Sequence, residues 1–166
     1  DYTTSKTNFN IVSCETCDFT FTNPRPLDKD LNSYYNSGTY ISHTNSSRGI
    51  FNWMYQNVRM YTTQTKVSLL KTVTKKGDHL DIGCGTGEFL NACNNLGFNT
   101  RGIEPSPLAR KQAIENYNLS VSGKSDLSQY PNSEFDSISM WHVLEHVPNL
   151  NETISDFQRV LKPNGK

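Results

Sequence analysis

The sequence predicts an α/β fold in the second half of the chain, with a mostly parallel sheet and helices on both faces. Short apolar segments alternate with segments of helical periodicity from Asp78 onward, which is typical of strand–helix–strand units. A glycine-rich turn, "GCGTG", follows the first of these strands. Sheets of this kind bind ligands at the carboxyl ends of their strands, so the turn marks the expected site.

Three regions differ in composition. Residues 1–48 are polar and irregular and are interrupted by "NPRP". Residues 49–76 predict a connecting helix, because apolar side chains recur at three- and four-residue steps and "KKG" is a suitable end. Residues 77–166 hold the α/β region. The 16 basic and 16 acidic residues cancel, which argues against a protein that holds nucleic acid or a membrane by bulk charge.

The elements of the α/β region are expected in a fixed order. The strand "HLDIG" precedes a helix over "GEFLNACNNLG", which Gly97 ends, and the strand "NTRGIEPS" precedes a helix over "SPLARKQAIENYN". Ser106 is the expected N-cap of this second helix, with Pro107 at its first position. "LSVSG" and "FDSISMW" predict two further strands, and "NETISDFQRVLKPNGK" a last helix and turn. That turn should feed another strand, so we expect a sheet truncated after the helix that follows the fourth strand.

The glycine turn reads Asp-x-Gly-x-Gly-x-Gly from Asp81 to Gly87. Glycine lets a ligand lie against the backbone N–H groups at the start of a helix. A dinucleotide fingerprint would need glycine at Glu88, and a phosphate-binding P-loop would need Gly-Lys-Ser/Thr; both are absent from the sequence. Glu104 follows Gly83 by 21 residues, at the end of the second strand. A carboxylate there can accept both ribose hydroxyls of a nucleoside.

The glycine turn resembles motif I of the class I S-adenosylmethionine-dependent methyltransferases, which have a Rossmann-like fold. "FDSISMWHVLEHVPN" and "RVLKPNG" resemble later motifs of the same superfamily, so the resemblance covers about residues 78–166. It implies S-adenosylmethionine as cofactor, with Glu104 on the ribose and Asp126 near the adenine amine. The cofactor-binding residues that it implies are Asp81, Gly83, Cys84, Gly85, Gly87, Glu104, Pro105, Asp126, Leu127 and Trp141.

"HVLEH" follows the fourth strand and carries two histidines and a glutamate. H-x-x-E-H also occurs in zinc proteases, but there it needs a regular helix, and here a strand leads in and Pro148 follows. In the methyltransferase interpretation, His142 or His146 is a candidate catalytic base. Alternatively, Glu145 and His146 help to hold a divalent metal, or they orient the loop by hydrogen bonds. The fullest form of the metal pattern has a glutamate where this chain has His142, which counts against the metal.

Cys14 and Cys17 form "CETC", which is half of a zinc site. The segment around them resembles the zinc-ribbon-like N-terminal part of one methyltransferase group, in which another Cys-x-x-Cys pair comes earlier. Zinc would therefore need a second ligand pair, and the alternative is two free thiols.

A group of aromatic residues and a histidine precedes the connecting helix. N-terminal segments of this superfamily often lie over the cofactor pocket, so the resemblance makes these residues candidate substrate contacts. The alternative is an aromatic cluster that packs a loop onto the domain. The residues are Tyr34, Tyr35, Tyr40 and His43.

The resemblance implies a methyltransferase that acts on a small-molecule acceptor, with O-, C- and N-methylation left open. No Asn/Asp-Pro-Pro-Tyr motif follows the fourth strand, which disfavours methylation of DNA bases or protein amides. The alternatives are a methyltransferase-like binding module without catalysis and, less favoured, a nucleotide-dependent oxidoreductase. The sequence has no signal-peptide pattern, no apolar run of membrane-span length and no disulfide-like cysteine spacing, so we expect a cytoplasmic protein. The oligomeric state is not predicted.

Overall fold

The computed structural model describes residues 7–27, residue 30 and residues 50–166. The chain divides into two compact units, residues 1–45 and residues 46–166. In the first unit, β1 (Ile11–Ser13) pairs antiparallel with β2 (Thr20–Thr22). The turn of this small hairpin holds Cys14 and Cys17.

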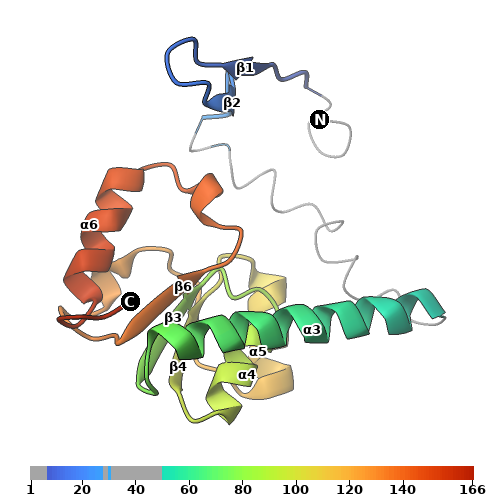
Figure 1. Ribbon diagram of the computed structural model, residues 1–166, viewed down its shortest axis with the longest axis vertical. Coiled ribbons are helices and arrows are strands. Elements are labelled where there is room, and N and C mark those ends of the chain that lie inside the picture. The colour runs from blue at the N-terminus through green and yellow to red at the C-terminus, as the bar shows by residue number, and fades with distance from the viewer. Residues whose placement is uncertain (1–6, 28–29, 31–49) are drawn as a thin grey trace. The chain divides into compact units, whose positions relative to one another are not determined.

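The second unit contains the predicted parallel sheet (Figure 1). Its strand order is β5-β4-β3-β6, and every neighbouring pair is parallel. The chain lays β4 and β5 on one side of β3 and then crosses to place β6 on the other side. The order therefore reverses between β3 and β6, and the carboxyl ends of these two strands form the crevice where open α/β sheets bind ligands. The strands are β3 (Asp78–Ile82), β4 (Asn99–Ile103), β5 (Val121–Ser122) and β6 (Ser137–Met140).

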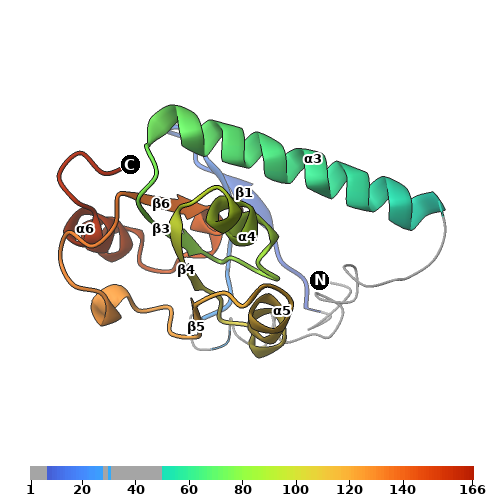
Figure 2. The same cartoon turned by 90° about the horizontal axis from the view of Figure 1, so that it is seen from below.

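Helices cover both faces of the sheet, as predicted: α3, α4 and α5 lie on one side and α6 on the other (Figure 2). Ser106 caps α5 by accepting a hydrogen bond from the Ala109 amide at 3.5 Å, and Pro107 takes the first helical position. The connecting helix ends three residues earlier than predicted. The helices are α3 (Ile50–Val73), α4 (Glu88–Asn95), α5 (Pro107–Tyr117) and α6 (Leu150–Val160).

The two faces of β3 differ in chemistry, because side chains alternate along a strand. Leu80 and Ile82 join the apolar cluster beneath α6, which also contains the fully buried Phe135. His79 and Asp81 point to the opposite face. There the His79 ring lies edge-on to two phenylalanines, with its centroid 5.9 Å from that of Phe89 and 6.0 Å from that of Phe98.

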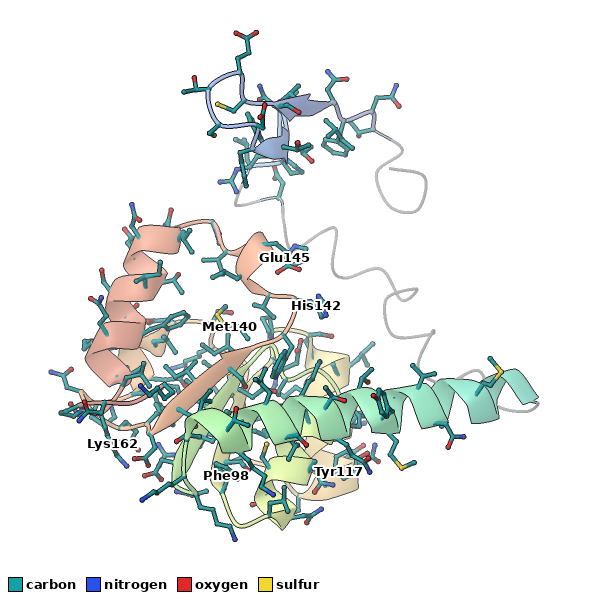
Figure 3. The ribbon with its side chains drawn as sticks, viewed as in Figure 1. Phe98, Tyr117, Met140, His142, Glu145 and Lys162 are labelled. Carbon is teal, nitrogen blue, oxygen red and sulfur yellow. The ribbon has the colours of Figure 1, made fainter. Side chains whose placement is uncertain are left out.

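The amino ends of β3 and β6 are tied together by Lys162, whose ammonium lies 2.7 Å from Asp78 and 2.8 Å from Asp136. Figure 3 shows Lys162 at the end of the sheet opposite to His142. Lys166 exchanges backbone hydrogen bonds with residues of the β6 segment, so the final turn returns the chain to that edge. Within the described part of the chain, no helix combines the length and apolar character that a membrane crossing requires.

Candidate functional site

The three glycines of the loop between β3 and α4 all have positive φ, but they face different surroundings. A Cβ added at Gly83 would collide with Val143, and one at Gly87 would lie 2.7 Å from Leu119. These two glycines allow close packing of protein against protein. A Cβ at Gly85 would meet no atom within 4 Å. Gly85 is therefore the position where a ligand can approach the backbone of the loop.

Glu104 lies beside this open position, at the end of β4, and is 8% exposed. Its carboxylate accepts hydrogen bonds from the backbone amide of Gly85 at 2.9 Å and from that of Ser106 at 2.8 Å. A carboxylate has about four acceptor sites, so two remain after these bonds are made. Those two sites suit a pair of neighbouring hydroxyls. Pro105, also predicted as a cofactor residue, is exposed next to Glu104.

Asp81 is the second acid of the site and is 2% exposed on β3. Its Oδ1 accepts a hydrogen bond from the Ser139 hydroxyl at 2.6 Å. Burial raises the pKa of Asp81 to about 7, while the Ser139 bond and the charge of Lys66 act in the opposite direction. Burial in turn lowers the pKa of Lys66, which reaches toward Asp81 from α3. A buried acid held in this way favours a cationic ligand group, because the cation compensates for the lost hydration.

Arg59 joins α3 to the glycine loop. Its guanidinium donates to the Thr86 hydroxyl at 2.8 Å and forms an ion pair with Glu88. The Thr86 hydroxyl in turn donates to the carboxylate of Glu88, 2.8 and 2.9 Å away from its two oxygens. The acid at the start of α4 is thus neutralised by protein. The sequence interpretation missed both Arg59 and Lys66, because it treated α3 only as a connecting helix.

Trp141 follows β6 and packs edge-on against Phe89, with ring centroids 5.5 Å apart. The Lys66 ammonium lies 4.8 Å from the Trp141 ring centre. Among the described residues the buried Nε1 of Trp141 has no hydrogen-bond partner. Since a buried indole N–H usually has an acceptor, this N–H is a candidate donor to a polar group of a ligand. Cys84 is buried between α4 and α5, and burial raises the pKa of its thiol, so it acts as a small apolar side chain.

Asp126 caps the short 3₁₀ turn η1 (Leu127–Gln129), where it accepts the Ser128 amide at 2.7 Å and the Ser128 hydroxyl. The Leu127 side chain lies in the apolar cluster beneath α6, and its carbonyl accepts a hydrogen bond from Arg159 at 2.9 Å. Any contact of Leu127 with an adenine would therefore come from its backbone. The predicted role of Asp126 at the adenine stays a prediction.

His142 and Glu145 lie beyond the carboxyl end of β6 (Figure 3). The His142 side chain is 87% exposed, and its Nδ1 is 3.9 Å from the Glu145 carboxylate. His146 is also exposed and belongs to η2 (Leu144–His146), a single 3₁₀ turn. This is the bend predicted from the sequence, in place of the regular helix that a zinc-protease signature needs. The catalytic roles of His142 and His146 stay predictions.

The predicted metal residues do not form a complete site among the residues described. No group of three or more His, Cys, Asp or Glu side chains that could hold a metal occurs in that part of the chain. The Thr16 and Cys17 amides lower the pKa of Cys14, which favours the thiolate, but two thiols make only half of a tetrahedral zinc site. Four predicted substrate contacts lie outside the described residues, namely Tyr34, Tyr35, Tyr40 and His43.

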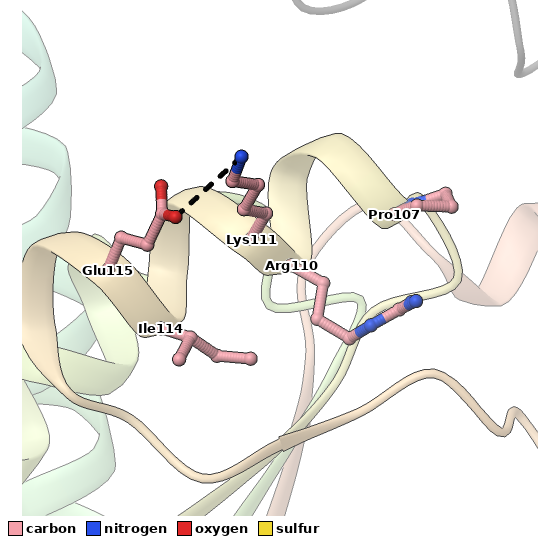
Figure 4. A pocket seen from close by; sticks show the side chains of 5 residues that line it. All are labelled: Pro107, Arg110, Lys111, Ile114 and Glu115. Atoms are coloured by element: carbon pink, nitrogen blue, oxygen red, sulfur yellow. Dashed lines mark ion pairs between the residues drawn. The ribbon is translucent and has the colours of Figure 1, made fainter.

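A surface hollow of about 310 Å³ lies along α5 (Figure 4). All its lining residues come from this one helix, and an exposed ion pair between Lys111 and Glu115, 3.7 Å long, crosses it. We assign no ligand to this hollow, since ligand sites in such folds gather residues from several strand ends.

Comparison with known proteins gives a family assignment. A family model described as a methyltransferase domain matches residues 55–166. The ubiquinone biosynthesis O-methyltransferase of Xanthomonas oryzae pv. oryzae (strain PXO99A) is 32% identical over 94 residues, which are 52% of this chain and 39% of that protein. The demethylmenaquinone methyltransferase of Tropheryma whipplei (strain Twist) is 32% identical over 98 residues, which are 57% of this chain and 41% of that protein. The chain thus spans about two fifths of the length of these relatives.

Among solved structures, the PH0226 protein from Pyrococcus horikoshii OT3 has the same fold, with a TM-score of 0.56 and 26% identity. The match covers 66% of this chain and 52% of that one.

Proposed function

The chain belongs to this family of methyltransferase domains, and from that premise we propose that it binds S-adenosylmethionine and transfers its methyl group to a small-molecule acceptor. The observation that carries the proposal is a pair of buried acids at the glycine loop: Asp81 lies on β3, directly before the loop, and Glu104 at the end of β4 is hydrogen-bonded to the open backbone at Gly85. S-adenosylmethionine has a ribose diol, an ammonium and a carboxylate, and it has no phosphates. The site matches that chemistry better than it matches a pyrophosphate.

In this proposal each group of the cofactor has a protein partner of suitable charge. The two free acceptor sites of Glu104 take the ribose hydroxyls, and Asp81 takes the ammonium. The backbone of Gly85 lies along the cofactor, and Lys66 supplies a cation for the carboxylate end. These contacts fix the sulfonium relative to the acceptor, and alignment of the reactants supplies most of the catalysis of methyl transfer.

The reaction is an in-line displacement. A lone pair of the acceptor forms a bond to the methyl carbon, the carbon–sulfur bond breaks, and its electrons return to sulfur to give S-adenosylhomocysteine. A base is needed only where the attacking atom carries a proton, and His142, on the loop after β6, is the candidate for that role. The two relatives are named as methyltransferases of ubiquinone biosynthesis and of demethylmenaquinone, which supports a small-molecule acceptor.

A cytoplasmic location is part of the proposal. It is supported by the four cysteines, which are all unpaired in the structure.

Calorimetric titration with S-adenosylhomocysteine tests the proposal. We expect one binding site per chain and no binding of NAD. The matched variants are Glu104→Gln, which should weaken binding, and Glu134→Gln, which removes an acid that pairs with Arg101 away from the glycine loop and should leave it unchanged. Absence of both calorimetric heat and thermal stabilisation at saturating S-adenosylhomocysteine would refute the proposal. Incubation of radiolabelled cofactor with quinol precursors then separates a catalyst from a module that only binds.

A further inference from the structure

A chain of hydrogen bonds, buried at His79 and partly buried at Ser139, leads to Asp81 between β3 and β6. The Ser137 hydroxyl lies 2.8 Å from Nδ1 of His79, and Nε2 of His79 lies 3.1 Å from the Ser139 hydroxyl. The Ser139 hydroxyl donates to Asp81 at 2.6 Å. The register of the strands produces this arrangement, because His79 pairs with Ser137 and Asp81 with Ser139. His79 has no exposed surface.

The direction of each hydrogen bond follows from Asp81, the last acceptor of this hydrogen-bond series. An ionised Asp81 only accepts, so the Ser139 proton points to it. The Ser139 oxygen must then accept from Nε2–H of His79, which leaves Nδ1 to accept from Ser137. This pattern assigns the neutral Nε2–H tautomer to His79. Burial lowers the pKa of His79 to about 4, in agreement with a neutral ring.

We propose that Ser139 and His79 are positioning residues for Asp81, which hold one of its carboxylate oxygens so that the other is presented to the ammonium of the cofactor. This inference rests on the proposed function. The neutral state of His79 matters, because a cationic imidazole would compete with the ammonium for the charge of Asp81. The hydrogen bonds that link Ser137, His79 and Ser139 therefore orient Asp81 without neutralising its charge.

Other ionisable groups surround Asp81 and must be considered in any test that varies pH. Lys66 faces it from α3, and Glu104 faces it from the end of β4 with the opposite effect. The thiols of Cys84 in the glycine loop and Cys93 on α4 stay neutral, because burial raises the pKa of each. With these groups unchanged, loss of the Ser139 hydroxyl removes a hydrogen bond that favours the ionised form of Asp81. The acid should then hold its proton to higher pH.

The test is the pH profile of S-adenosylhomocysteine affinity between about pH 5.5 and pH 8.5, measured by calorimetry for the wild type, Ser139→Ala and Ser139→Thr. For the wild type we expect affinity to rise with pH and level off above about pH 7, as Asp81 ionises. Ser139→Ala should bind about tenfold more weakly at neutral pH, with a midpoint about one pH unit higher. Ser139→Thr keeps the hydroxyl and should restore the wild-type profile.

Two further measurements separate positioning from a general structural effect. 5′-Methylthioadenosine keeps the adenosine and the sulfur but lacks the ammonium, so its affinity should be equal for the wild type and Ser139→Ala and independent of pH. His79→Phe keeps an aromatic ring between Phe89 and Phe98 while removing the donor to Ser139. It should shift the S-adenosylhomocysteine profile in the same direction.

The outcomes separate this inference from the proposed function. If the wild type binds neither ligand, both fail. If the wild type binds S-adenosylhomocysteine and the Ser139→Ala profile has an unchanged midpoint, the inference alone fails. It also fails if Ser139→Ala loses affinity for both ligands equally, because that pattern would reflect damage to the fold.

Discussion

Replacement of Asp81 by asparagine should make the folded protein more stable at neutral pH while weakening cofactor binding. Burial raises the pKa of Asp81 from 3.8 to about 7. The folded protein therefore binds more protons than the unfolded chain between these values, and its stability falls as the pH rises across that window. Above about pH 7 the penalty is constant.

The size of the effect follows from the shift. A difference of about 3 pH units at 1.36 kcal/mol each gives a ceiling of about 4 kcal/mol for the cost of the buried charge. The asparagine still accepts from Ser139, but its amide hydrogens need acceptors, and the attraction to Lys66 is lost. Since an unsatisfied buried donor costs about 1–3 kcal/mol, we expect a net gain of about 1–3 kcal/mol at pH 8.

Urea unfolding at pH 4 and pH 8 measures this gain. The advantage of Asp81→Asn should be present at pH 8 and nearly absent at pH 4, where the wild-type side chain is protonated in the folded protein and close to its titration midpoint in the unfolded chain, so that little of the penalty remains. Asp136→Asn is the control, because Lys162 lowers the pKa of Asp136 and its replacement should reduce stability at pH 8. The reasoning is refuted if Asp81→Asn is destabilised at pH 8 as much as Asp136→Asn.

Four further variants probe the site. Glu104→Gln should weaken S-adenosylhomocysteine binding by about 1.5–3 kcal/mol in calorimetry, because the glutamine NH₂ group would face a backbone N–H that now donates a hydrogen bond to the Glu104 carboxylate. Unchanged affinity would remove Glu104 from the site. Gly85→Val should block binding with little loss of melting temperature. Gly87→Val should lower the melting temperature, since its Cβ would lie 2.7 Å from Leu119. An equal fall in melting temperature for the two variants would contradict the different roles given to these glycines. His142→Ala should reduce turnover about 10²–10⁴-fold with cofactor affinity unchanged if His142 is the base, and wild-type turnover would assign that histidine no chemical role.

The sequence was sufficient to predict the parallel sheet and the position of the glycine loop. The order of strands and helices after Asp78 follows from local periodicity, and the structure confirms it. The expectation that Glu104 stands near the glycine turn also follows from topology, because both lie at carboxyl ends of adjacent parallel strands. The hydrogen bond between Glu104 and the Gly85 amide places the two side by side.

The contacts that Arg59 of α3 and the two serines of β6 make at the site were not predicted, because they depend on residues distant in sequence. Arg59 reaches Thr86 across 27 residues, and the crossing of α3 over α4 that allows it has no local sequence signal. In the sequence alone, nothing distinguishes His79 from the other residues of a buried strand. Its bonds to Ser137 and Ser139 span 58 and 60 residues and require the register of β3 against β6.

A crystal structure of the protein with S-adenosylhomocysteine tests the central claim most directly. The account predicts the ribose hydroxyls on the Glu104 carboxylate, the ammonium within hydrogen-bonding distance of Asp81, and the ligand lying against the backbone of Gly85. Density for the ligand at any other place in the fold, or an empty glycine loop in crystals saturated with it, would contradict the account.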